Sequence, residues 1–543
     1  DGSNGGLAAN YTLSGGTHQL TVNQRPLNAT IQRFYDGSLN ANGSDLSSFD
    51  SLQGGETLFL SGTGTVSNKN VSSNQSVTLG TLALSDTGAT GDTANYSLNS
   101  AELNIVQRPI STVYLTKLYD ASTTVQASDL QTMSNLVGSE TLTLTGTSTI
   151  SDANVGTKTV NTGGFTLNDQ AGANASSGGL ASNYILSGGT HQLIINQRPL
   201  NATLARQYDG TTTAAGSTLS SFDALQGGET LTLSGSGTAA NDNVANGISV
   251  SSLGTLALAN GTGAASNYSL NSAAINITQR VLNSSGSKTY NANTNALAAD
   301  ITLSNLVSGE ALNHSGTAST SSANAASYTI TNLAGITIAD GSGGTASNYT
   351  LTGGTHNFVV NQKVISLSGS RLYDATTNAV ASDLTTISGR VGSETLALNG
   401  TGSVSNANVS NNKTVTLGTL ALGNGTGLAA NYTLSGGTHQ LTVNQRPLNA
   451  TLARQYDGTT ASAGSTLSSF DALQGGETLT LSGSGTAASA NVANGITMSS
   501  NGNLALADGT GAASNYRLNS TVINIAKRVL TSSGSKTYDA NTN

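Results

Sequence analysis

Apolar residues along this chain recur at every second position, in short runs separated by turn-forming residues. Leu20 and Val22 alternate with polar neighbours, and Leu58 and Leu60 do the same further on. A period of two is the pattern of a β-strand with one buried face. Clusters of Gly, Asn, Ser and Thr between the runs supply the conformations that turns require. The pattern predicts an all-β protein and indicates no amphipathic helix.

Two tyrosine motifs recur along the whole chain. A Tyr-Asp pair returns every 82 to 89 residues, with Tyr290-Asn291 in its place once, and an Asn-Tyr pair precedes each following Tyr-Asp by about twenty residues. A third motif, QRPL or a variant of it, lies between the two, and its proline fits the start of a strand. We therefore place the repeat boundaries at this motif. The expected segments are the C-terminal part of a repeat at 1–24, six complete repeats at 25–107, 108–197, 198–279, 280–362, 363–445 and 446–527, and the N-terminal part of a further repeat at 528–543.

The predicted architecture is a linear array of tandem β-sandwich-like modules of ~83 residues, each with about six short strands, joined end to end without linkers. Strand-like sequence such as HQLTVNQRPLNATLAR runs through each boundary without a flexible tract. A β-solenoid is the alternative, because its turns are also rich in Gly, Asn and Thr. A solenoid should show a sub-period of about 20 residues inside each repeat. No such sub-period is found, and discrete modules in an extended rod are favoured.

Composition narrows the functional classes. Charged residues make up 9% of the 543 positions, the net charge is −8, and there is no cysteine. These values exclude a basic surface for nucleic acid, a disulfide framework and thiol chemistry. No apolar run is long enough for a membrane helix, so no membrane insertion is expected. A chain that is poor in charge and free of cysteine is compatible with export in an unfolded state.

The order of motifs in each repeat resembles that of the YDG and MBG repeat domains. QRPL at Gln197, YDG at Tyr208, GGETLTLSG at Gly227, LGTLAL at Leu253 and SNYSL at Ser266 follow one another in this order. Such repeats occur in large secreted bacterial surface proteins that are similar to filamentous-haemagglutinin adhesins. The resemblance implies stalk or filler modules, an extracellular location on a bacterial surface or secreted fibre, and no catalytic residues to carry over.

The residues that recur in fixed places are interpreted as structural anchors of the repeat. A Tyr-Asp carboxylate and a GGET or GSET glutamate in each repeat could form an acid–base pair. Tandem copies of one active site, with Asn291 replacing one acid, would be peculiar for an enzyme, so no catalytic, cofactor-binding or metal residue is expected. The anchors are Tyr35, Asp36, Glu56, Tyr96, Arg108, Tyr119, Asp120, Tyr208, Asp209, Glu229, Tyr268, Tyr456, Asp457, Glu477 and Tyr516.

The arginines of the QRP motif are expected to pair with an acid. In a chain that otherwise avoids charge, a base kept at the start of each repeat indicates a specific partner. We predict that Arg198 and Arg446 each pair with a nearby Glu or with the Asp of the Tyr-Asp motif, and so set the angle between modules.

Two motifs contain residue types that can bind a metal ion. The sequence GGTH carries one histidine per repeat at His18, His191, His356 and His439, without a second ligand at metal spacing. The loops before Asn-Tyr contain Asp, Asn and Gly but mostly one carboxylate, whereas calcium generally needs more. An Asx-type turn is favoured there, and calcium is the alternative.

Two functions of different kinds follow. The first is a structural repeat region of a secreted bacterial fibre or adhesin stalk that gives length and stiffness, with self-association along or between fibres into filaments or a biofilm matrix. The alternative is a repeated glycan- or surface-binding module that uses exposed tyrosines. Aromatic residues make up 4% of the chain, which favours the first.

Overall fold

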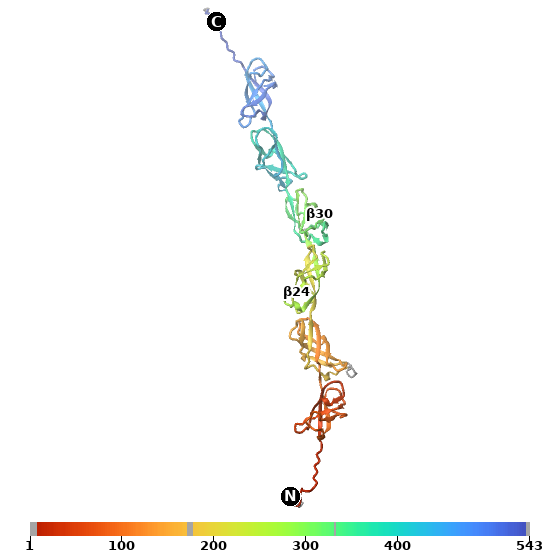
Figure 1. Cartoon of the computed structure of the whole chain (residues 1–543). Helices are drawn as coiled ribbons and strands as arrows, with labels where there is room; N and C mark the ends of the chain where they lie inside the picture. Colours follow the sequence, from red (N-terminus) through yellow and green to blue (C-terminus); the bar gives the residue numbers. More distant parts are fainter. Residues whose placement is uncertain (1–7, 171–177, 331–332, 539–543) are drawn as a thin grey trace. The chain divides into compact units, whose positions relative to one another are not determined.

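The structure is a computed structural model that describes residues 8–170, 178–330 and 333–538. Within these ranges the chain forms β-strands and three-residue 3₁₀ helices, and the all-β, tandem-repeat prediction is confirmed. The described part contains no helix that is long and apolar enough to cross a membrane. Two compact units, Asp1–Thr278 and Gln279–Asn543, each hold three complete repeats that follow one another in chain order (Figure 1).

The strands of the first unit belong to the repeats at 25–107, 108–197 and 198–279, called repeats 1 to 3. The strands are β1 Arg25–Phe34, β2 Asn40–Asn42, β3 Leu46–Phe49, β4 Phe59–Ser61, β5 Thr63–Thr65, β6 Ser72–Ser76, β7 Ala83–Ser85, β8 Tyr96–Val106, β9 Arg108–Pro109, β10 Thr112–Leu118, β11 Thr124–Gln126, β12 Leu130–Ser134, β13 Leu142–Thr149, β14 Gly156–Thr159, β15 Phe165–Asp169, β16 Tyr184–Ile185, β17 Gln192–Asn196, β18 Arg198–Gln207, β19 Thr213–Ala215, β20 Leu219–Phe222, β21 Leu231–Ser234, β22 Ser236–Ala239, β23 Ala245–Ser252, β24 Ala257–Asn260 and β25 Tyr268–Thr278.

The strands of the second unit belong to the repeats at 280–362, 363–445 and 446–527, called repeats 4 to 6. The strands are β26 Arg280–Val281, β27 Asn283–Thr289, β28 Asn295–Leu297, β29 Ile301–Ser304, β30 Leu312–Ser319, β31 Ala326–Thr329, β32 Ile336–Asp340, β33 Tyr349–Thr350, β34 His356–Asn361, β35 Lys363–Val364, β36 Ser366–Leu372, β37 Asn378–Val380, β38 Thr386–Ser388, β39 Leu396–Asn399, β40 Thr401–Ser403, β41 Ser410–Thr414, β42 Ala421–Asn424, β43 Tyr432–Thr433, β44 His439–Asn444, β45 Arg446–Gln455, β46 Thr466–Phe470, β47 Leu479–Ser482, β48 Thr486–Ala487, β49 Ala493–Ser500, β50 Ala505–Asp508 and β51 Tyr516–Ala526.

Short 3₁₀ helices occur at two kinds of place. One kind ends at the asparagine of each Asn-Tyr motif: η1 Ala8–Asn10, η3 Thr93–Asn95, η6 Ala181–Asn183, η8 Ala265–Asn267, η10 Ala346–Asn348, η12 Ala429–Asn431 and η13 Ala513–Asn515. The other kind lies between strands: η2 Gly43–Asp45, η4 Ala127–Asp129, η5 Thr162–Gly164, η7 Gly216–Thr218, η9 Ala298–Asp300 and η11 Ala381–Asp383.

Repeat 3 illustrates the topology of the repeat, and the other repeats are variants of it. Its main sheet has the strand order β19-β22-β23-β25-β18-β20, and β21 pairs with β24 in a second sheet. The repeat contains the eight strands β18 to β25, so the expectation of about six was too low. Strands β19 and β22, of three and four residues, bury only small residues, and alternation of large apolar residues therefore does not reveal them. Along β18 the alternation holds, and Leu200, Ala202 and Leu204 are buried.

The first and last strands of each repeat lie side by side and run parallel. In repeat 3, β18 and β25 pair in parallel over ten residues, from Arg198 opposite Tyr268 to Gln207 opposite Thr278, with one bulge. Repeats 1 and 6 have the same ten-residue pairing, between β1 and β8 and between β45 and β51. In repeats 2, 4 and 5 both strands are broken, and the pairing divides into a two-residue piece and a piece of five or six residues. The chain therefore contains an unbroken and a broken class of repeat.

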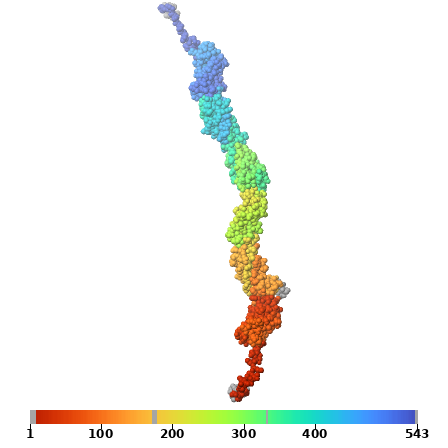
Figure 2. All heavy atoms as spheres, in the orientation of Figure 1, coloured from red at the N-terminus to blue at the C-terminus, as the bar shows by residue number. Residues whose placement is uncertain are grey.

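Consecutive repeats within a unit share one hydrophobic core. A single cluster of buried residues runs from Ala29 in repeat 1 through repeat 2 to Tyr268 in repeat 3, and another runs from Tyr290 to Tyr516 in the second unit. Only one residue separates the last strand of repeat 1 from the first strand of repeat 2, and this residue is Gln107. In the space-filling view no gap separates successive repeats within a unit (Figure 2).

Candidate functional site

The recurrent residues meet at the junctions between repeats. At the junction of repeats 1 and 2, Glu140 accepts a hydrogen bond at each carboxylate oxygen. Tyr35 of repeat 1 donates to Oε1 at 2.7 Å, and Tyr184 of repeat 2 donates to Oε2 at 2.6 Å. The two tyrosine rings pack edge to face with centroids 5.5 Å apart. We call this arrangement the Tyr–Glu–Tyr clamp.

The clamp recurs at every described junction inside the two units, with the Tyr-Asp tyrosine from one repeat and the glutamate and Asn-Tyr tyrosine from the next. The further clamps are Tyr119–Glu229–Tyr268, Tyr290–Glu394–Tyr432 and Tyr373–Glu477–Tyr516. The ring centroids in these three lie 5.2 to 5.4 Å apart.

Backbone contacts place the three side chains before they meet. The N–H of Tyr35 donates to the carbonyl of Val106 at the end of β8, which fixes the tyrosine at the end of repeat 1 that adjoins repeat 2. The turn that carries Glu140 is closed by its own N–H, which donates to the carbonyl of Val137. The N–H of Val137 in turn donates to the Tyr184 hydroxyl at 2.9 Å. Because the Tyr184 hydroxyl accepts this N–H, its own proton is directed at the carboxylate.

Burial and the carboxylate keep the clamp tyrosines neutral. At the second junction, burial and the hydrogen bond to Glu229 raise the pKa of both Tyr119 and Tyr268 to about 12. Burial, followed by the hydrogen bond to Glu140, raises the pKa of Tyr35 and Tyr184 further above the ordinary value. A phenol that stays protonated remains a donor to the carboxylate, and hydrogen bonds to a charged group contribute about 1.5 to 3 kcal/mol.

A buried asparagine forms a second contact across each junction. Asn183, the asparagine of an Asn-Tyr motif in repeat 2, is 0% exposed. Its Oδ1 accepts from the N–H of Val71 in repeat 1 at 2.9 Å, and its Nδ2 donates to Oδ1 of Asn70 at 3.0 Å. The same pair of bonds joins Asn267 to Val155 and Asn154, Asn431 to Ala325 and Asn324, and Asn515 to Val409 and Asn408.

The arginine of the QRP motif contacts the backbone of the preceding repeat. Arg108 donates to the carbonyl of Tyr35 at 3.3 Å and to the carbonyl and side chain of Asn135. Arg198 donates to the carbonyl of Tyr119, and Arg446 donates to that of Tyr373. The prediction that Arg198 and Arg446 pair with an acid is therefore wrong. The clamp glutamates accept from tyrosine hydroxyls instead, and the carboxylate of the preceding Tyr-Asp motif pairs with the base three residues before it.

Comparison with known families finds matches to one domain in tandem along the chain. The model of the YDG domain matches residues 16–103, 107–191, 196–277, 274–356, 359–441 and 439–523, which together span most of the chain. The chain belongs to the YDG domain family. A comparison with curated proteins finds no match.

The aspartate of each YDG motif stabilises its own loop and not the junction. Asp120 pairs with Lys117, three residues before it, at 2.9 Å, and it also accepts from the N–H of Ser122. Equivalent pairs are Arg33–Asp36, Arg206–Asp209, Arg371–Asp374 and Arg454–Asp457. Sequence analysis missed this base, although it recurs three residues before every YDG aspartate. The base of each pair is buried and the aspartate is partly exposed, so solvent screens the charge interaction from the aspartate side and each pair contributes at most about 1 kcal/mol.

The two outermost positions of the described array lack one side of the clamp. Glu56 in repeat 1 accepts from Tyr96 at 2.5 Å, and the described residues supply no second hydroxyl to it. Tyr456 in repeat 6 is 40% exposed, whereas Tyr119 is 3% exposed and Tyr208 is 4% exposed.

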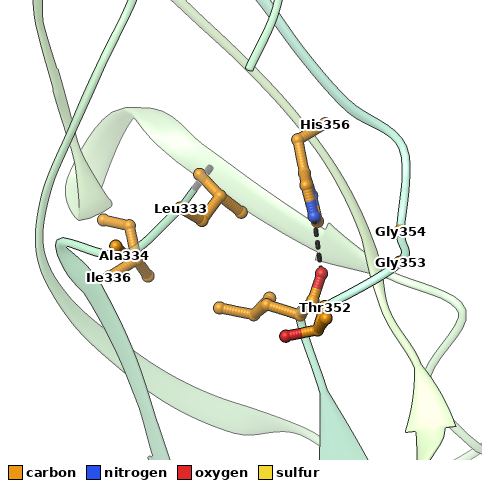
Figure 3. Close-up of a pocket in the computed structure, with 8 residues that line it drawn as sticks. Leu333, Ala334, Ile336, Thr352, Gly353, Gly354 and His356 are labelled. Atoms are coloured by element: carbon orange, nitrogen blue, oxygen red, sulfur yellow. Dashed lines mark hydrogen bonds between the residues drawn. The ribbon is translucent and has the colours of Figure 1, made fainter. Parts of the chain in front are cut away.

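In the broken class of YDG repeat, each histidine of the GGTH motif contacts the carbonyl of the residue five positions before it, across a turn. His356 is buried, and its Nε2 lies 2.8 Å from the carbonyl of Leu351 (Figure 3). His191 and His439 make the same contact, at 2.7 and 2.8 Å. A cavity of about 370 Å³ beside His356 is lined by Leu333, Ile336 and the 351–354 turn, and none of its described lining residues is acidic.

The structure also shows how the loops before Asn-Tyr are closed. The carboxylate of Asp340 accepts from the N–H of Ala346 at 2.7 Å, and Asp508 accepts from Ala513 at the same distance. These bonds join residues six and five positions apart and so close the whole loop, whereas the Asx-type geometry is found at Asp92, which accepts from the N–H of Ala94 at 2.8 Å. Within the described residues no three His, Asp or Glu side chains gather as metal ligands do.

Proposed function

We propose that this chain is the load-bearing repeat region of a secreted bacterial surface fibre or adhesin stalk. The observation that carries the proposal is the parallel pairing of the first and last strands in every YDG repeat. Tension along the chain pulls the start of β18 one way and the end of β25 the other way. Because the strands are parallel, this force shears their hydrogen bonds together and does not open them one after another.

The junctions support the same function. A stalk must pass tension from one repeat to the next without a weak linker. Here a single glutamine lies between the strands of consecutive repeats. Its side chain is hydrogen-bonded, since Gln107 donates to the carbonyl of Ser182 and Gln197 to that of Ser266. The clamp and the buried asparagine add contacts whose donors and acceptors lie on different repeats. Each repeat therefore supports its neighbours.

The recurrent tyrosines fit this function better than glycan recognition. A sugar-binding platform needs exposed aromatic faces, whereas Tyr119 and Tyr268 are 3% and 2% exposed and face each other. The low charge and lack of cysteine agree with an extracellular location that is reached by export of an unfolded chain.

Single-molecule force spectroscopy tests the proposal. Pulling the chain by its two ends should give six unfolding events, each releasing about 83 residues, or on the order of 290 Å before the folded length is subtracted. The broken repeats 2, 4 and 5 should unfold at lower force than the unbroken repeats 1, 3 and 6, because their parallel pairing is divided. Extension without distinct force peaks would refute a load-bearing role.

A further inference from the structure

One position next to the parallel strands differs between the two classes of repeat. In repeat 3 this position directly follows β20, the strand that pairs antiparallel with β18. The unbroken repeats 1, 3 and 6 carry an aspartate there, at Asp50, Asp223 and Asp471. The broken repeats 2, 4 and 5 carry residues without a carboxylate, which are Asn135, Asn305 and Gly389. The presence of one acid therefore separates the two classes.

In repeat 3 this acid, Asp223, holds Asn201 of β18. The backbone N–H of Asn201 donates to Oδ1 of Asp223 at 2.9 Å, and Nδ2 of Asn201 donates to Oδ2 at 2.7 Å. In return, the N–H of Asp223 donates to the carbonyl of Asn201 at 3.3 Å. The aspartate thereby fixes both the backbone and the side chain of the asparagine.

The fixed asparagine joins β18 to β25 at the bulge in their parallel pairing. Its Oδ1 accepts from Nδ2 of Asn271 at 2.9 Å and from the hydroxyl of Ser272 at 2.6 Å. Asn201 lies opposite Ser272, and Asn271 is the extra residue of the bulge. Because a bulge disrupts the ladder locally, these side-chain bonds connect the strands where backbone pairing is interrupted.

We call the four residues Asp223, Asn201, Asn271 and Ser272 the bulge bridge. Both other unbroken repeats contain the same bonds. The residues are Asp50, Asn28, Asn99 and Ser100 in repeat 1, and Asp471, Asn449, Asn519 and Ser520 in repeat 6.

An asparagine at the acid's position makes a different set of bonds. Asn135 of repeat 2 has a left-handed backbone, with φ 72°. Its Nδ2 donates to the carbonyl of Pro109 at 2.8 Å, and its Oδ1 accepts from Arg108 at 2.7 Å, so it holds the short strand β9. An amide can donate to a carbonyl, whereas an ionised carboxylate only accepts. In repeat 4 the same bonds join Asn305 to Val281 and Arg280.

We propose that this side chain determines the mechanical strength of a YDG repeat, and that the stalk has two levels of strength as a result. The inference rests on the proposed load-bearing function and names the residue that regulates it. Tension enters repeat 3 at the start of β18, and Asn201 is the fourth residue of that strand. The bulge bridge therefore lies near the loaded end and has to break before the strands can slide past each other. Repeats without the acid unfold first, so the stalk lengthens in two stages.

Force spectroscopy of the full chain tests the proposal with Asp50→Asn, Asp223→Asn and Asp471→Asn combined. The wild-type chain should show three unfolding events at higher force and three at lower force. In the triple variant the three stronger events should move toward the lower level. At constant force these repeats should unfold about three to ten times faster, because a charged hydrogen bond exposed to solvent contributes less than a buried one.

The matched control replaces three other aspartates in the same repeats. Asp36→Asn, Asp209→Asn and Asp457→Asn together remove acids that pair with a base in their own loop and lie outside the bulge bridge. This variant should keep the three stronger events at the wild-type force. Equal effects of the two triple variants would show general destabilisation and would overturn the proposal.

Hydrogen–deuterium exchange of Asp223→Asn tests the bulge bridge without force. The N–H of Asn201 should exchange about three to ten times faster than in the wild type when local opening limits exchange. The N–H of Ala239, which donates to the carbonyl of Thr212 elsewhere in repeat 3, should keep the wild-type rate.

The outcomes distinguish this inference from the proposed function. A wild-type chain without distinct force peaks would refute the load-bearing function, and this inference with it. Wild-type peaks that the first triple variant leaves unchanged would overturn the inference alone, and the GGTH turn of the broken repeats would then account for the two classes.

Discussion

Removing one hydroxyl from a clamp measures how strongly neighbouring YDG repeats are coupled. Tyr119→Phe keeps the ring that packs against Tyr268 and deletes only the bond from Tyr119 to Glu229, which spans 2.6 Å. The acceptor is a carboxylate and Tyr119 is 3% exposed, so the loss falls in the range of about 1.5 to 3 kcal/mol for a charged hydrogen bond. The other oxygen of Glu229 keeps its bond to Tyr268 at 2.5 Å, so the carboxylate is not left without a partner. We expect about 2 kcal/mol.

Hydrogen–deuterium exchange is the suitable assay, because an array of six repeats need not unfold in one transition. The N–H of Gln226 donates to the Tyr268 hydroxyl, so a peptide that contains Gln226 and Glu229 reports on the junction directly. A loss of about 2 kcal/mol accelerates exchange about 30-fold when local opening limits it. Tyr456→Phe is the matched control, because Tyr456 occupies the same motif position but is exposed, and it should change stability by less than about 0.5 kcal/mol.

A double-mutant cycle isolates the pair itself. Tyr119→Phe, Glu229→Gln and the double variant should give a coupling energy of about 1.5 to 3 kcal/mol. A coupling below about 0.5 kcal/mol, or equal effects of Tyr119→Phe and Tyr456→Phe, would show that the clamp does not hold the repeats together.

Three further predictions follow from the same geometry. The pKa of about 12 at Tyr119 and Tyr268 lies above the ordinary value of 10.0, so the tyrosines of the unfolded chain lose their protons at lower pH than those of the folded chain. The free energy of unfolding should therefore be unchanged below about pH 10 and fall between about pH 10 and 12. A Tm, followed by circular dichroism, that stays constant over this range would contradict the neutral clamp. Asn267→Ala should cost about 1 to 3 kcal/mol by denaturant unfolding because it leaves a buried N–H without an acceptor, whereas Asn95→Ala, exposed in repeat 1, should cost almost nothing. Asp209→Asn should cost less than about 1 kcal/mol in the same assay, since its pair is exposed on the Asp side and repeat 4 already carries asparagine there; a loss above 3 kcal/mol would contradict a local role.

The repeat and its strands could be predicted from sequence because both leave a local signal. Alternation marks Leu200, Ala202 and Leu204 as one buried face, and the spacing of the Tyr-Asp pairs sets the period. The three-residue strand β19 leaves no such signal, which is why the strand count per repeat was underestimated.

The junction could not be predicted, because its partners are distant in sequence. Tyr35 donates to a glutamate 105 residues further on, past the end of its own repeat. Periodicity shows that Tyr35 and Glu140 both recur but not that they meet. The same gap led to the wrong partner for Arg198, because charge alone suggested an acid while the structure provides the carbonyl of Tyr119. The pairing of Lys117 with Asp120 could have been predicted, since their spacing of three residues is visible in the sequence.

We propose that these YDG repeats form a stalk whose length and stiffness come from linker-free, clamped junctions. Electron micrographs of the purified full-length chain test it most directly. The account predicts extended rods that keep their direction from one repeat to the next. Compact globules, or beads that are oriented independently of their neighbours, would contradict it.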